Sequence, residues 1–151
     1  MSHVNTAARA SAPSQASRLA RLRMASLGAV TMLIIQYVLG IIYNLYGTMP
    51  TAAKSIGLFS SPVLALHVIL SILLLMAAVL LLVRAIGARH KLTIWMAAVG
   101  LIEIVAAGFA GLVFTSKGSA GASLGMALAF AVSLACYVVV LVVLAPARSA
   151  V

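Results

Sequence analysis

The sequence predicts an all-α integral membrane protein, a four-helix bundle whose helices cross a bilayer in up-down-up-down order. Hydrophobic residues make up 65% of the 151 residues and charged residues only 7%, against about 45–50% and 25% in soluble domains. The charged residues also divide the chain into four apolar intervals, and each interval can hold the roughly 20 residues that a spanning helix needs. These intervals lack the alternation of barrel strands, which excludes a transmembrane barrel.

The four intervals predict a transmembrane domain over residues 24–145. The expected helices span about 25–46, 63–84, 92–114 and 122–144. Residues 1–23 are rich in Ala, Ser and Arg and contain no acid, so we expect a disordered, basic cytoplasmic head. A mitochondrial transit peptide is the alternative interpretation of this head. Residues 146–151 form a short cytoplasmic tail.

The basic residues predict the orientation of the chain in the membrane. The net charge is +9, but Lys and Arg gather at the ends of the predicted spans, and the side richer in them faces the cytoplasm. Of the ten basic residues, only Lys54 and Lys117 fall on the opposite side from both termini. Both termini are therefore expected to be cytoplasmic, in a bacterial-type plasma membrane or, alternatively, a mitochondrial inner membrane. We expect this charge to contact anionic lipids and not nucleic acid.

Two polar residues are expected near the bilayer centre. Gln36 and Glu103 lie at similar distances from the starts of two predicted helices that run in the same direction. Because Glu103 is the only acidic residue and an ionised acid is costly at that depth, we expect a neutral carboxylic acid. It either bonds to Gln36 as an interhelical contact or carries protons.

A second polar layer is expected nearer the outer surface. His67 enters the second predicted helix close to its outer end, and Tyr43, Asn44 and Met126 fall at a similar depth. Gly111 lies at the same level and leaves room for a neighbouring backbone or a flat ligand. His67 either bonds to Tyr43 or Asn44 and orders the bundle, or binds a ligand.

Three stretches, "MLIIQYVLGIIYNLYG", "LALHVILSILLLMAAVLLL" and "GLIEIVAAGFAG", resemble one four-helix half of haem A synthase. They are also similar to small bacterial four-helix membrane proteins that carry the same histidine. The resemblance implies that His67 is an axial haem ligand. That family has a second histidine in its fourth helix, where this chain has none. We therefore take Met126 as the opposite ligand, because a His/Met pair also holds haem b. The outer-loop acidic and cysteine residues linked to catalysis in that family are missing, so haem A synthesis is not expected.

Three functions follow from these features. The first is an accessory or structural membrane role, with a membrane-protein partner or further copies of the chain. The second is a b-type haem-binding or quinone-associated redox protein with His67 as axial ligand, and the third is a proton-coupled transporter that uses Glu103. No catalytic triad, metal-spaced cluster or phosphate loop occurs in the sequence, so an enzyme is not expected.

Overall fold

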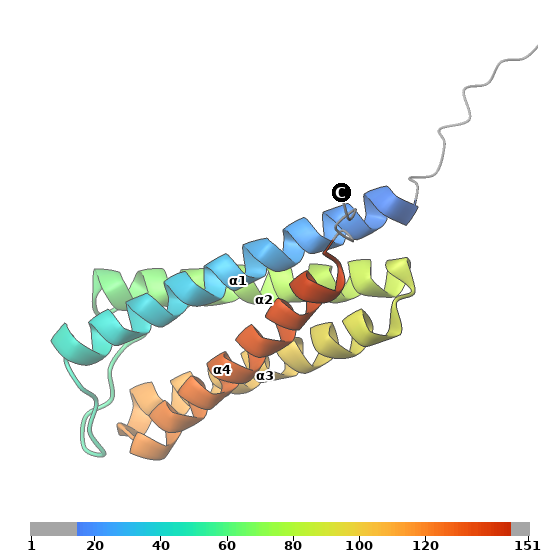
Figure 1. Ribbon diagram of the computed structural model, residues 1–151. Coiled ribbons are helices and arrows are strands. Elements are labelled where there is room, and N and C mark those ends of the chain that lie inside the picture. Colours follow the sequence, from blue (N-terminus) through green and yellow to red (C-terminus); the bar gives the residue numbers. More distant parts are fainter. Residues whose placement is uncertain (1–14, 146–151) are drawn as a thin grey trace, which may run out of the picture.

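The computed structural model describes residues 15–145, and every regular element in this part of the chain is a helix. The elements are α1 (Gln15–Tyr46), α2 (Pro62–Ala88), α3 (Lys91–Lys117) and α4 (Ala120–Val143). The four helices lie side by side, and successive helices run in opposite directions (Figure 1). Each one is long and apolar enough to cross a membrane. The predicted all-α class and the four membrane-spanning lengths are confirmed.

Helix α1 is longer than the sequence predicts. It begins at Gln15, so residues 15–23 are helical although they belong to the segment expected to be a disordered head. The physical reason is that this stretch combines good helix formers with Leu22, which is fully buried. The remaining head, residues 1–14, and the predicted tail, residues 146–151, lie outside the described residues.

The later helices begin and end at residues that satisfy the free backbone groups of helix termini. Ser61 accepts a hydrogen bond from the Leu64 backbone N–H at 3.2 Å, and proline occupies the first position of α2. The Nδ1 atom of His90 accepts from the Thr93 backbone N–H at 3.4 Å and caps α3. Helices α2 and α3 are joined by two residues, as are α3 and α4, which makes both connections tight hairpins.

The helices pack in a ring. Helix α1 contacts α2 and α4, and α3 contacts the same two helices. Within residues 15–145, the diagonal pairs α1–α3 and α2–α4 do not pack against each other. This arrangement decides which of the predicted polar contacts can form.

Inward-facing positions on α1 and α2 recur at alternating steps of three and four residues, the spacing of a left-handed coiled coil. On α1 they are Leu22, Ser26, Ala29, Leu33, Gln36, Gly40 and Tyr43. On α2 they are Leu64, His67, Ser71, Leu74, Ala78, Leu81 and Ala85. Gln36 bonds to Ser71, and His67 lies against Gly40. These two contacts define an antiparallel register that also places Leu33 opposite Leu74 and Leu22 opposite Ala85.

Helices α3 and α4 pack closely because small residues line their interface. The ring of Tyr137, which is fully buried, lies on Gly100. The Ser133 hydroxyl donates to the Gly100 carbonyl at 3.3 Å. On the other side of α4, the Ser26 hydroxyl donates to the Tyr137 carbonyl at 3.0 Å and connects α1 to α4.

The loop between α1 and α2 packs on the α3–α4 hairpin. The Ile56 backbone N–H donates to the Thr115 carbonyl at 2.9 Å, and the Pro50 carbonyl lies against Gly118. Gly118 ends α3 with φ 65°, a conformation that suits glycine. The loop therefore connects the two hairpins at this end of the bundle.

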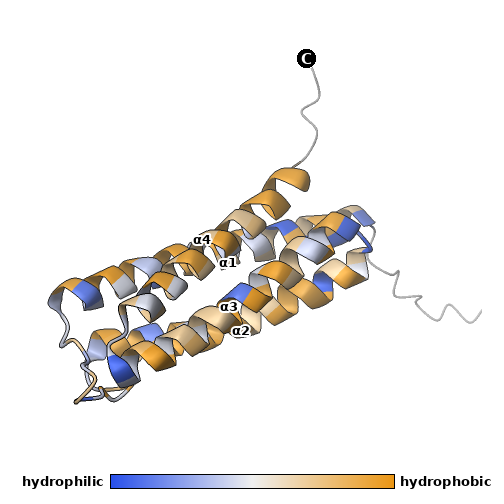
Figure 2. Ribbon diagram, turned by 90° about the horizontal axis from the view of Figure 1, so that it is seen from below, coloured by the Kyte–Doolittle hydropathy of each residue, from blue (hydrophilic) through white to orange (hydrophobic). Residues whose placement is uncertain are grey.

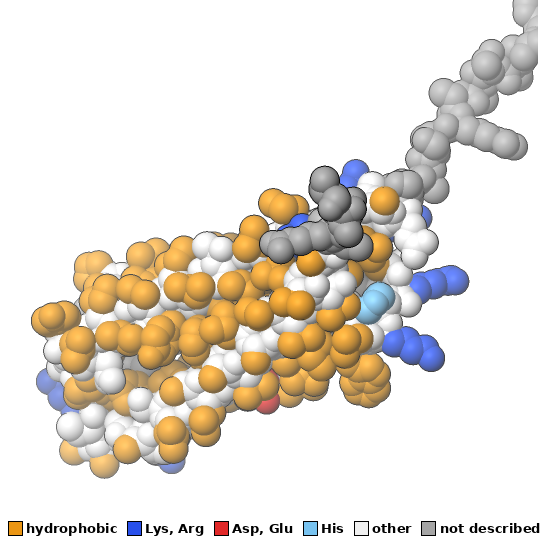
Figure 3. All heavy atoms as spheres, in the orientation of Figure 1, with side chains coloured by type: hydrophobic (Ala, Val, Ile, Leu, Met, Phe, Trp, Pro, Cys, Tyr) orange, Lys and Arg blue, Asp and Glu red, His pale blue; other side chains and the backbone are white. Residues whose placement is uncertain are grey.

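The surface of the bundle is apolar around its middle and basic at its ends. Polar residues concentrate toward the helix ends and loops (Figure 2), and Lys and Arg side chains gather at the two ends of the face shown in Figure 3. Met76, Phe109 and Val142 are each more than half exposed, an arrangement that suits lipid and not water. Trp95 and Tyr46, near helix ends, are 68% and 84% exposed, as expected for residues at a membrane interface.

The contact between Gly100 and Tyr137 predicts a specific sensitivity to substitution. A Cβ atom on Gly100 would lie 2.6 Å from Cε1 of Tyr137, whereas a Cβ on Gly108 would meet nothing within 4 Å. Gly100→Ala should therefore lower the free energy of unfolding by about 1–3 kcal/mol, the usual cost of overpacking. Gly108→Ala should be neutral or stabilising by up to about 1 kcal/mol, because alanine favours helix.

Reversible unfolding in mixed detergent micelles measures both values. Equal effects of the two substitutions would contradict the packing described for the α3–α4 interface.

Candidate functional site

The polar cluster between α1 and α2 is the candidate site, and it is organised by the amide of Gln36. The Gln36 Nε2 group donates to the backbone carbonyl of His67 at 2.9 Å and to the Ser71 hydroxyl. The Ser71 hydroxyl donates to the same carbonyl at 2.8 Å. Because lipid offers no hydrogen-bond partners, a polar side chain inside a bundle favours contacts of this kind with a neighbouring helix.

The imidazole of His67 lies over Gly40 of α1. Its Cε1 atom is 3.6 Å from the position that a Cβ on Gly40 would take. The His67 Nδ1 atom and the Gln36 Oε1 atom are both buried and have no hydrogen-bond partner among the described residues. A neutral imidazole keeps one donor and one acceptor, so this cluster retains hydrogen-bonding capacity that the chain does not use.

Tyr43 and Asn44 do not join His67. Tyr43 is buried, but its hydroxyl donates to the Thr48 carbonyl of the following loop at 2.9 Å. Asn44 is exposed. The expected bond from His67 to either residue is absent from the described structure, because the alternating three- and four-residue spacing turns Gln36, Gly40 and Tyr43 inward and leaves Asn44 outside.

Gln36 and Glu103 do not meet either. They lie on α1 and α3, the diagonal helices that do not pack together, and Gln36 is bonded to α2. Glu103 is partly exposed and lies close enough to Cys136 of α4 to interact with it electrostatically. Its carboxyl group makes no hydrogen bond or ion pair with any residue between 15 and 145. A similar depth of the two residues in the membrane therefore did not predict that their side chains are in contact.

Met126 belongs to a different interface from His67. Its sulfur is 3.5 Å from the position that a Cβ on Gly111 would take, so it packs between α3 and α4. Met126 and Gly111, which were expected only at a similar depth, are therefore in contact across this interface. His67, in contrast, packs toward α1, and its helix α2 does not contact α4 in the described part of the chain.

Two hollows among the described residues lie toward the ends of the bundle. One, of about 260 Å³, lies beneath the loop between α1 and α2 and is lined by Tyr43, Thr48, Lys54, Ser55, Ile56, Gly57, Ser60 and Ser61. The other, of about 480 Å³, lies between the start of α1 and the end of α2. Neither hollow is lined by His67 or Met126. Residues 15–145 also contain no group of three or more His, Cys, Asp or Glu side chains that could hold a metal ion.

The sequence did not single out several residues that make interhelical contacts. Ser71 completes the Gln36 cluster, and Ser26, Ser133 and Tyr137 connect α4 to its neighbours. The signal that identifies Ser71 is its spacing, since it follows Leu64 and His67 at alternating steps of three and four residues. A search for that spacing would have placed Ser71 on the same face as His67.

Comparison with known proteins gives no assignment, since no family model, curated protein or solved structure matches the chain. The resemblance to haem A synthase stays a prediction. The fold and hydropathy define the chain as a multi-pass membrane protein with four spanning helices.

The Gln36–Ser71 hydrogen bond predicts energetic coupling between the two side chains. In a double-mutant cycle of Gln36→Leu and Ser71→Ala, the coupling energy should be about 0.5–1.5 kcal/mol, the range of interhelical hydrogen bonds in membranes. Thr31→Val is a matched control, because Thr31 is exposed and its hydroxyl bonds only to Leu27 of its own helix.

The cycle is measured by unfolding in mixed micelles. A coupling energy near zero for Gln36 and Ser71, or one as large for Gln36 and Thr31, would contradict the contact.

Proposed function

We propose that this chain is an accessory or structural protein of a bacterial-type plasma membrane, without redox or transport activity of its own. One observation supports the proposal more than any other. His67 packs on Gly40 between α1 and α2, whereas Met126 packs on Gly111 between α3 and α4. The polar and sulfur-bearing residues of the outer half are thus used to join helices in two separate interfaces.

A haem held between His67 and Met126 does not fit this arrangement. The unpartnered Nδ1 atom of His67 has the chemistry of a haem ligand. However, a flat macrocycle between the two residues would have to displace the imidazole from Gly40 and the thioether from Gly111. Because neither residue lines either of the two hollows described above, we assign His67 to helix packing.

A visible absorption spectrum tests this assignment. Protein expressed with haem supplied and purified in mild detergent should show no Soret band, oxidised or reduced with dithionite. A stoichiometric Soret band that disappears in His67→Ala would overturn the proposal in favour of a b-type haem protein. Met126→Leu would then tell whether the thioether is the second ligand, because loss of a methionine ligand shifts the reduced spectrum and the potential.

The position of the basic residues supports an orientation with both termini cytoplasmic. Arg18, Arg21 and Arg23 lie in the first turns of α1, and Arg84 and Arg89 lie at the end of α2. These two helix ends meet at the same end of the bundle (Figure 1). The positive-inside rule places that end in the cytoplasm, where anionic headgroups are available to the exposed guanidinium groups.

The surroundings of Glu103 favour a structural role over proton transport. Leu33, Leu74 and Ile104 form part of the buried apolar core, and Ile104 is the next residue after Glu103. A proton relay needs a series of polar or ionisable groups, and Cys136 is the titratable group on which Glu103 acts electrostatically in the part of the chain described here. A partly exposed acid of this kind instead suits contact with another membrane protein.

Proton flux in liposomes distinguishes these two roles of Glu103. With an imposed pH gradient and a potassium diffusion potential, the wild-type protein and Glu103→Gln should give the same flux as protein-free vesicles. The glutamine keeps the size and hydrogen-bonding ability of the side chain but carries no titratable proton. Flux that rises with the amount of wild-type protein and is lost in Glu103→Gln would establish the transporter hypothesis instead.

A further inference from the structure

We propose that Arg21 and Arg84 form a binding site for the phosphate group of an anionic phospholipid. The site is the hollow of about 480 Å³ between the start of α1 and the end of α2. Its lining consists of Ala20, Arg21, Met24 and Ala25 from α1 and Arg84 from α2. The proposal depends on the chain lying in a membrane, and it is independent of the accessory role and of the part played by His67.

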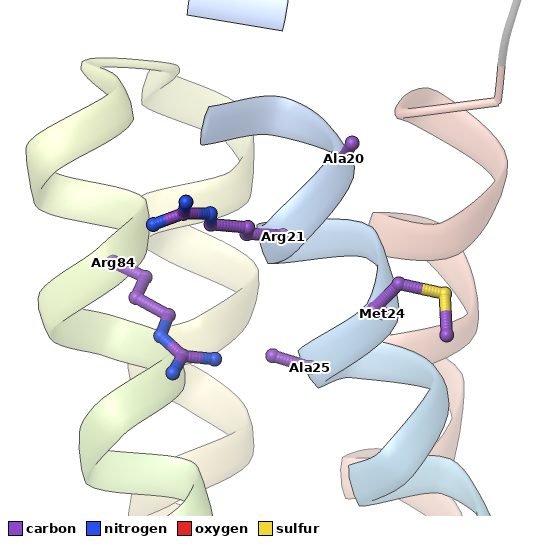
Figure 4. A pocket seen from close by; sticks show the side chains of 5 residues that line it. All are labelled: Ala20, Arg21, Met24, Ala25 and Arg84. Atoms are coloured by element: carbon purple, nitrogen blue, oxygen red, sulfur yellow. The ribbon is translucent and has the colours of Figure 1, made fainter. Parts of the chain in front are cut away.

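Both arginine side chains line one gap between α1 and α2. Arg21 extends from α1 toward α2, and Arg84 extends from α2 toward Ala25 of α1 (Figure 4). Each arginine is next in sequence to a fully buried residue, Leu22 or Ala85. The register of α1 on α2 places these two buried residues opposite each other, so the two arginines start from fixed backbone positions about two residues, or about 3 Å, apart along the bundle.

Within residues 15–145, the gap holds positive charge without a counter-ion. The only acidic residue, Glu103, lies in the middle of α3. Among residues 15–145, no hydrogen bond or ion pair of Arg21 or Arg84 is found. Two like charges facing one gap favour an anion between them, and the planar guanidinium group binds phosphate oxygens in a bidentate manner.

The rest of the lining matches a lipid. Ala20, Met24 and Ala25 give the hollow an apolar floor, and Met24 is 66% exposed and flexible enough to follow an acyl chain. Arg84 lies one turn inside α2 from Ala88, at the border between the apolar span and the basic Arg89 and Lys91. Lipid phosphates lie at this border, and basic pockets between helices on the cytoplasmic side bind anionic headgroups.

Native mass spectrometry of the full-length protein tests the site. In detergent micelles, phosphatidylglycerol should bind the wild-type protein more tightly than phosphatidylcholine does. The double variant Arg21→Gln/Arg84→Gln should weaken the first phosphatidylglycerol by about tenfold or more, given about 1 kcal/mol for each basic residue near the headgroup. The matched control Arg23→Gln/Arg89→Gln removes the same two charges from outside the lining, and its effect should be less than about threefold, because direct charge-assisted contacts to the phosphate are lost only in the first variant.

Two further measurements distinguish a lipid site from diffuse surface charge and from a site for free phosphate. Ala20→Phe fills the floor at an exposed position and keeps both arginines, so it should also weaken phosphatidylglycerol binding while leaving the melting temperature unchanged. Millimolar inorganic phosphate should compete only weakly, because it lacks acyl chains. Equal weakening by the two double variants would show diffuse surface charge, and full displacement by inorganic phosphate would show a free-phosphate site. Either result would overturn the proposal.

Discussion

The amide of Gln36 is the contact on which the α1–α2 half of the bundle depends. In hydrocarbon a side-chain amide needs partners on a neighbouring helix, and Gln36 finds both of its acceptors on α2, at the His67 carbonyl and the Ser71 hydroxyl. These two acceptors lie 2.8 Å from each other on α2, so a donor that serves both favours one alignment of the helices. The same alignment brings His67 over Gly40, leaves Asn44 outside and brings Arg21 and Arg84 to within about one turn of the same level at the far end.

The two hairpins of the bundle are held together by different means. Helices α1 and α2 are aligned by polar side chains, whereas α3 and α4 approach closely over Gly100 and Gly111 and are stabilised by dispersion contacts with Tyr137 and Met126. A polar contact specifies register, and a surface of small residues permits proximity but specifies register less strictly. The bulky Tyr137 ring on Gly100 supplies the specificity that α3 and α4 would otherwise lack.

Length, hydropathy and charge were sufficient to predict four spanning helices, because each of these properties acts locally along the chain. The sequence did not predict correctly which neighbouring helix a side chain faces, because that depends on the rotation of each helix about its axis. It matched Gln36 with Glu103 by depth alone, although the two residues occupy diagonal helices. It also left residues 15–23 outside the first helix, because the burial of Leu22 depends on contacts that local composition does not contain.

The contact of the loop between α1 and α2 with Gly118 has a consequence for biosynthesis. The loop that follows α1 is made before α3 and α4, yet its partners, the Thr115 carbonyl and Gly118, exist only once α3 is complete and the chain has turned toward α4. The loop is therefore translated early but can reach its final contacts only after α3 has been made. The packing of this loop on the second hairpin can therefore be completed only in a late step of assembly, after both hairpins have formed.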